Sequence, residues 1–195
     1  YIKIAVDNGA APGSYWLTGS QAYRLMELAQ ESLAGRTAIL HMSALSQSEL
    51  CGAMEVSPFS LELDELQKRK ALLSPATPNE IYQRIWDGAL PGLRSGKYKD
   101  RDVFYSSYIQ TYIDRDVTTD IPGVDKVMFA DFIRAAACRS GQMLNLHDIA
   151  GDVGVSDDTA KRWMKELEKS GIVFFLHPYS NNLLKRTIKT PKMYF

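Results

Sequence analysis

The chain has 195 residues, of which 45% are apolar, and its 23 Lys and Arg residues balance its 23 Asp and Glu residues. This size suits one large or two small domains with substantial cores, and the zero net charge excludes a uniformly basic nucleic-acid coat protein. Two isolated cysteines, Cys51 and Cys138, and three scattered histidines predict no metal site and a reduced, cytoplasmic protein. No apolar run reaches the ~20 residues needed to cross a bilayer, and no signal peptide is visible, so we expect no membrane partner.

The first 43 residues predict an α/β arrangement. Residues 2–7 read as a short helical or extended piece, and a helix over 20–35 separates two expected buried strands at 14–20 and 37–42. Parallel strands joined by a helix bind ligands beyond their carboxyl ends. Thr18 and Ser20, at the end of the first strand, are therefore candidates for sensing a phosphate. A purely structural strand–helix–strand unit is the alternative reading.

Residues 44–123 predict a mostly helical region. The segments with helical patterns are 44–50, 64–73, 79–93 and 101–117. We expect Asn79 to cap the third of them, and we expect that helix to end at Gly88 and Pro91. The last carries an aromatic stripe that is typical of core packing, at Phe104, Tyr105, Tyr108 and Tyr112. Arg115, between two aspartates, is expected to organise ion pairs, and a hinge is expected at residues 121–125.

Residues 145–171 predict a helix-turn-helix unit. Asn145 and Ser156 are typical helix N-caps, and Gly154 between the two helices tolerates a positive φ. Apolar residues recur at helical spacing in both helices: Leu146, Ile149, Ala150 and Val153, then Ala160, Trp163, Met164 and Leu167.

The flanking segments complete the pattern of a winged helix over residues 124–195. A preceding helix over 124–141 has an expected core face that includes Val127, Met128, Phe132 and Ala135. After the unit, a strand over 172–179, a turn at 180–182 and a strand-like stretch over 183–195 predict a β-hairpin. The predicted fold class is therefore mixed and mostly α, with an α/β piece first and a winged helix last.

Charge is distributed unevenly along the chain. From Lys161 to the end there are eight basic residues and two acidic ones, which leaves fifteen basic and twenty-one acidic residues before that point. This asymmetry suggests an anionic partner, most plausibly DNA. The alternative is a solvated charged face on a scaffold or interaction domain.

Helix geometry indicates which side chains of the second helix would contact DNA. With its apolar stripe buried, the outward positions are Thr159, Arg162, Lys165, Glu166 and Lys169. Arg162 is the best candidate for a base edge, and Lys165 or Lys169 for phosphates. Lys185 and Arg186 add basic side chains from the hairpin. Glu166 in the middle of this face fits a DNA backbone poorly, which weakens the case for a tight, sequence-specific reader.

Several sequence segments, taken together, resemble those of a prokaryotic group of AAA-type P-loop ATPases. Members of this group carry a C-terminal winged helix and then a restriction-endonuclease-like domain. The matching phrases are WLTGSQ (16–21), ESLAGR (31–36), LSQSE (45–49), YIQTYIDRDV (108–117), the helix-turn-helix, and PYSNNLLKRTIKTPKMYF (178–195). The resemblance implies a remnant of the ATPase core over 1–43, a helical lid or linker over 44–123, and the winged helix over 124–195.

The resemblance also implies site residues. Thr18 and Ser20 would lie near the γ-phosphate of ATP, and Arg36 would occupy the position of an arginine finger, which stabilises charge on the transferring phosphoryl group. ATP and Mg²⁺ would be cofactors of the parent protein. The chain contains no G-x-x-x-x-G-K-[ST] loop and no acidic pair to hold Mg²⁺. Since it also begins at Tyr1 and stops in a strand-like pattern, we expect both ends to be cut.

Three hypotheses follow from the sequence. The first is a fragment of a nucleotide-driven switch coupled to a winged helix, with DNA or a protein as its target. The second is a non-enzymatic DNA-binding regulator whose front half forms homo-oligomers or senses a ligand. The third is a protein-interaction module in which the winged helix is a rigid scaffold. An independent metabolic enzyme fits least, because no nucleophile–base pair or paired carboxylates stand out.

We predict that this chain alone neither binds ATP tightly nor hydrolyses it, because no loop of its sequence can cradle the phosphates that Arg36 and Thr18 would contact. Isothermal titration of the chain with MgATP tests this prediction. A dissociation constant in the micromolar range would contradict it.

Overall fold

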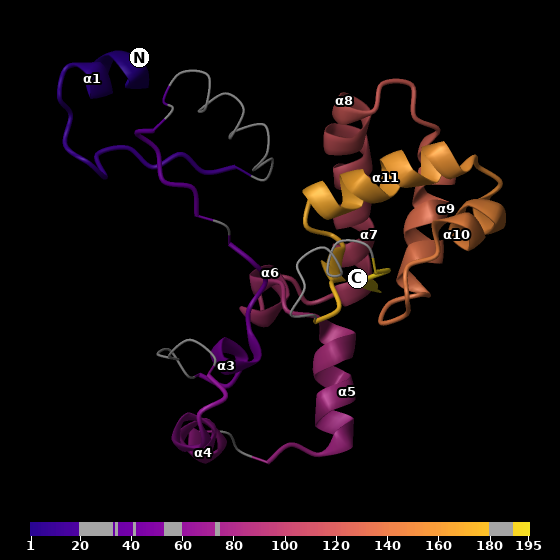
Figure 1. Ribbon diagram of the computed structural model, residues 1–195, viewed down its shortest axis with the longest axis horizontal. Helices are drawn as coiled ribbons and strands as arrows, with labels where there is room; N and C mark the ends of the chain where they lie inside the picture. Colours follow the sequence, from indigo (N-terminus) through magenta and orange to yellow (C-terminus); the bar gives the residue numbers. More distant parts are fainter. Residues whose placement is uncertain (20–32, 34, 41, 53–59, 73–74, 180–188) are drawn as a thin grey trace. The chain divides into compact units, whose positions relative to one another are not determined.

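The computed structural model describes residues 1–19, 33, 35–40, 42–52, 60–72, 75–179 and 189–195 (Figure 1). The chain divides into two compact units, one formed by Tyr1–Ile39 with Ile109–Phe195 and the other by Leu40–Tyr108. The described part is mostly helical with a single two-stranded sheet, as the predicted fold class requires. The divisions expected at residues 43/44 and 123/124 stay predictions.

The front of the chain does not form the two expected strands. Helix α1 spans Ile2–Asp7, whereas residues 14–19 and 37–40 are exposed and have no strand structure. The prediction of buried strands there was wrong for these described residues. A strand has no hydrogen bonds of its own and forms only where neighbouring strands supply them. The helix expected over 20–35 lies outside the described residues, apart from buried helical Leu33 and the turn at Gly35.

The described part of the second unit contains four short helices before residue 100: α3 (Gln47–Leu50), α4 (Leu63–Leu72), α5 (Pro78–Asp87) and α6 (Pro91–Arg94). Thr77 caps α5, because its side chain accepts from the Glu80 N–H while the Glu80 carboxylate accepts from the Thr77 N–H at 2.7 Å. The predicted cap at Asn79 was therefore wrong by two residues. Pro78 at the first helical position explains the shift, since proline there needs no hydrogen bond. The predicted end at Gly88 is confirmed, since α5 stops at Asp87 and Gly88 follows it at a φ of 72°.

Helix α7 (Arg101–Thr111) continues into a π-helix, η1 (Tyr112–Val117), and a last short turn, α8 (Thr118–Asp120). The helix predicted over 101–117 is present, but its final turn is wider than expected. In η1 the buried side chains are Tyr112, Ile113 and Val117, and a five-residue spacing brings Val117 over Tyr112. Ile121, within the expected hinge, is buried in the same core.

Helix α9 spans Lys126–Ala137 and begins at Asp125, whose carboxylate accepts from two backbone N–H groups. Its buried residues are Phe129, Phe132, Ile133 and Ala136. The predicted face was partly wrong: Val127 is 73% exposed, and Met128 and Ala135 only border the core. Both sets have helical spacing, so the packing partner decides which one turns inward.

Helices α10 (Leu146–Val153) and α11 (Asp157–Lys169) follow, joined by a short turn in which Gly154 has a φ of 76°. The side chains of Asn145 and Ser156 accept from backbone N–H groups in the first turns, which confirms both predicted caps. The predicted apolar stripe of α11 is confirmed as fully buried, and that of α10 faces the same core. Figure 1 shows α9, α10 and α11 gathered into one bundle.

Strands β1 (Phe174–Leu176) and β2 (Lys192–Tyr194) pair antiparallel, with Phe174 opposite Tyr194. Both are shorter than the strands predicted over 172–179 and 183–195. The expected turn at 180–182 lies outside the described residues. Met143, ahead of α10, forms an isolated antiparallel bridge to Lys192 and so ties the sheet to the helices.

The corrected face of α9 generates a matched pair of variants. We expect Ile133→Ala to lower the unfolding free energy by about 2–5 kcal/mol, because Ile133 is only 5% exposed and its loss leaves a cavity. Val127→Ala on the same helix should change it by less than about 0.5 kcal/mol. Urea denaturation followed by circular dichroism measures both, and equal losses would contradict this orientation of α9.

Candidate functional site

The outward face of α11 presents unpaired basic side chains, among them Arg162 and Lys165. Arg162 and Lys165 are exposed, and neither forms an ion pair within the part of the chain that the structure describes. Thr159 is half-buried, and its hydroxyl accepts from Ser156 Oγ at 2.9 Å. These three residues come together on one side of α11 because the burial of Trp163, Met164 and Leu167 fixes the rotation of the helix.

Lys169, also predicted to contact phosphate, has partners inside the protein. Its Nζ lies 2.8 Å from a carboxylate oxygen of Asp120 and 3.8 Å from one of Glu166, and its side chain is 28% exposed. A lysine held between two carboxylates offers little charge to a phosphate. Its role as a DNA contact stays a prediction, and the structure gives it a second role.

Glu166 corrects the sequence interpretation most directly. It was expected to face outward, yet it is 8% exposed and is the one buried charged residue among those described. Burial raises the pKa of its carboxyl above 4.5, and the neighbouring carboxylates of Asp120 and Asp116 raise it further, while Lys169 opposes the rise. Glu166 therefore belongs to an internal polar contact with η1 and α8.

Sequence reasoning missed this contact because its members are distant in the chain. Asp120 and Lys169 are 49 residues apart. A helical pattern relates only positions within a few residues of each other. The sequence signal is local: Asp116 and Asp120 are four residues apart, and Glu166 and Lys169 are three apart, so each pair shares one side of its own helix.

The structure describes only some of the other basic residues near the end of the chain. Lys185 and Arg186 lie outside the described residues. Lys189 and Lys192, which follow them, are exposed, and Lys192 is part of β2. From Lys161 onward, the described basic residues thus lie in two places, on α11 and at the end of the chain.

Of the residues predicted to act on nucleotide, the structure describes Thr18 and Arg36. Thr18 is exposed in an irregular segment, Ser20 lies outside the described residues, and Arg36 forms an ion pair with Asp7. Within the described ranges no cluster of His, Cys, Asp or Glu residues could hold a metal ion. The roles of Thr18, Ser20 and Arg36 toward ATP and Mg²⁺ stay predictions that concern a longer protein.

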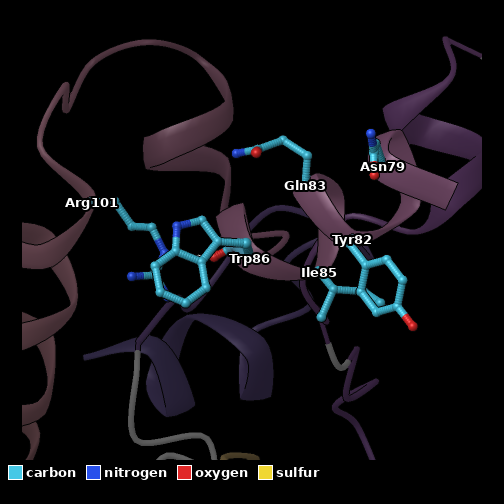
Figure 2. Close-up of a pocket in the computed structure, with 6 residues that line it drawn as sticks. All are labelled: Asn79, Tyr82, Gln83, Ile85, Trp86 and Arg101. Carbon is cyan, nitrogen blue, oxygen red and sulfur yellow. The ribbon is translucent and has the colours of Figure 1, made fainter. Parts of the chain in front are cut away.

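A shallow depression in the second unit is lined by α5 and the start of α7 (Figure 2). The Arg101 guanidinium lies 4.1 Å from the centre of the Trp86 ring, and its Nε donates to the Trp86 carbonyl at 2.5 Å. Arg101 also pairs with Asp102. These contacts hold the two helices together and engage the Arg101 guanidinium within the protein.

Both cysteines lie within the described residues. Cys51 and Cys138 are both free thiols and both exposed. Among the helices of the described ranges, none combines the length and the apolar character that a bilayer crossing needs.

Two known protein families match parts of the chain. Residues 1–51 match an AAA domain, which supports an AAA-type ATPase-like region at the front of the chain. Residues 78–195, more than half of the chain, match the family described as Domain of unknown function (DUF8612), and the chain belongs to that family.

Two mycobacterial proteins are similar over nearly the whole chain. The uncharacterized proteins of Mycobacterium bovis and Mycobacterium tuberculosis are each 25% identical to it over 198 residues, which covers 99% of this chain. The chain spans 38% of the length of these relatives. No solved structure matches the chain.

The raised pKa of Glu166 predicts how stability depends on pH. The folded state holds the Glu166 proton more tightly than the unfolded state, so this contribution is full below pH 4.5 and is lost as the pH rises through the folded pKa. The groups that face Glu166 are Asp116, Asp120 and Lys169. We expect Glu166→Gln to gain stability relative to the wild type as the pH rises above 4.5.

Urea denaturation at a series of pH values measures this difference. Glu168→Gln, two residues along the same helix at an exposed position, is the matched control and should follow the wild type. A constant difference between Glu166→Gln and the wild type across the series would show that folding does not raise the pKa of Glu166.

Proposed function

We propose that the chain is part of an AAA-type ATP-binding protein in which residues 124–195 form a winged helix-turn-helix domain that binds DNA. The proposal is carried by the exposed face of α11, where Arg162 and Lys165 have no partner among the described residues. The turn between α10 and α11, and the strand pair β1–β2 after them, support it.

In this proposal α11 is the helix that enters the major groove. Arg162 contacts a base edge or a phosphate, and Lys165 contacts a phosphate. Thr159 lies near the N-terminal end of α11, where this helix meets the DNA backbone. Lys185 and Arg186 contact the adjacent backbone. Because few side chains reach base edges and Glu166 and Lys169 are engaged internally, the binding is dominated by phosphate contacts and discriminates weakly between sequences.

The front segment belongs to the same proposal. In the longer protein Thr18 and Ser20 sense the γ-phosphate, and Arg36 acts as an arginine finger toward ATP in its own or a neighbouring subunit of a homo-oligomer. Bound ATP with Mg²⁺ would supply the phosphoryl group whose charge such a finger stabilises. Arg36 would have to leave Asp7 to do so. The protein is proposed to act in the reducing cytoplasm.

A protein-interaction module is the second candidate, and one observation favours it. Phe174 and Leu176 lie on the outer face of β1 and are each more than half exposed, and Phe174 stacks on Tyr194 at 5.1 Å between ring centres. An exposed apolar sheet face is typical of a surface that packs against another protein.

Salt-dependent DNA binding distinguishes the two candidates. We expect the chain to bind a duplex of about 30 base pairs with an affinity that falls steeply with NaCl, and Arg162→Ala/Lys165→Ala to weaken binding and reduce the salt slope by about 2. Fluorescence anisotropy measures both quantities.

Lys97→Ala/Lys99→Ala is the matched control, because it removes two exposed positive charges from the other unit. Equal losses in both double variants would indicate general charge attraction. An affinity that neither double variant changes would favour the interaction module.

A further inference from the structure

The last turn of α11 is attached to the preceding helical segment at two points. Lys169 Nζ lies 2.8 Å from the Asp120 carboxylate at the end of α8, and the hydroxyls of Ser170 and Tyr112 share a hydrogen bond of 2.9 Å. These contacts join residues 49 and 58 positions apart. They fix the C-terminal end of α11 on η1 and α8, and Lys165 and Arg162 lie four and seven residues before Lys169 on the same helix.

Because Glu166 is buried, this attachment depends on the charges of the residues around it. It is buried beside Asp120 and Asp116, whose side chain is 15% exposed, and Arg115 donates to Asp116. Lys169 supplies positive charge to both Asp120 and Glu166. Removing one partner of a buried charged group leaves the other uncompensated, which is costly. The position of α11 therefore depends on Lys169 remaining between these two carboxylates.

We propose that Asp120, Glu166 and Lys169 are positioning residues that hold α11 on the η1–α8 segment and thereby aim Arg162 and Lys165 at DNA. The inference rests on the proposed DNA binding. It assigns Lys169 a role that excludes direct phosphate contact. Since Lys165 and Arg162 lie four and seven residues from Lys169, or about 6 and 10 Å along the helix at 1.5 Å per residue, a change in the tilt of α11 at its held end displaces both basic side chains.

The two roles of Lys169 predict opposite results for Asp120→Asn. If Lys169 contacts a phosphate, removing its internal partner frees it, and DNA affinity stays the same or rises. If Lys169 positions α11, the same change loosens the helix and weakens binding by about two- to fivefold, the range expected for loss of one ion pair. Asp120 lies on α8 and is acidic, so its loss cannot remove a DNA contact.

A charge exchange provides the decisive variant. Asp120→Lys/Lys169→Asp restores an ion pair but removes the positive charge from α11. We expect each single change to weaken DNA binding and to lower the melting temperature, and the double exchange to recover most of both. A phosphate-contacting Lys169 predicts instead that the double exchange stays weak and that the salt slope falls by about 1.

Asp114→Asn is the matched control. Asp114 lies in η1 and pairs with Lys126 at 2.7 Å, so the change breaks an ion pair of the same segment that does not involve α11. It should leave DNA affinity unchanged. Equal weakening by Asp114→Asn and Asp120→Asn would overturn the positioning role, because loss of any ion pair would then suffice.

The outcomes separate this inference from the proposed function. A wild-type chain without salt-dependent DNA binding overturns both. Binding that depends on Arg162 and Lys165 but is not recovered by the double exchange overturns the positioning role alone. Recovery of affinity together with melting temperature, at an unchanged salt slope, supports it. Circular dichroism of every variant verifies that the comparison is between folded proteins.

Discussion

The C-terminal part of this protein depends on one aromatic contact, in which Trp163 of α11 meets Phe129 and Phe132 of α9 edge to face. The ring centres are 5.2 and 5.4 Å apart, within the range at which such pairs add to the burial of apolar area. The indole N–H of Trp163 is buried and has no acceptor among the described residues. The Trp163 ring therefore stabilises the fold through its apolar surface, and its position sets the rotation of both helices.

That rotation has consequences on the opposite side of α11. With Trp163 inward, Arg162 and Lys165 must face solvent, whereas Glu166 lies at the border of the core and meets η1 and α8. The π-turn of η1 contributes, because it buries Tyr112 and Val117 and brings Asp116 close enough to raise the pKa of Glu166. One helix therefore combines an open basic surface with an internal polar contact.

Local signals predicted the parts of the fold that are determined locally. The caps at Asn145 and Ser156 and the positive φ of Gly154 depend on one or two neighbouring residues, and all three are confirmed. The strands at 14–20 and 37–42 were wrong for the described residues because a strand needs partners that a local pattern does not contain. Of the candidate DNA contacts, helical spacing correctly placed Arg162 and Lys165 outside.

By itself, the sequence determined the helix-turn-helix segment and its apolar stripes, because capping and 3.6-residue periodicity act within about two turns of chain. Only the tertiary structure decided which face of α9 turns inward and that Glu166 is buried with Lys169 beside Asp120. The physical reason is the same in each case. A side chain at the edge of an apolar stripe turns toward the core or toward solvent according to what packs against it, and here that partner lies tens of residues away in the chain.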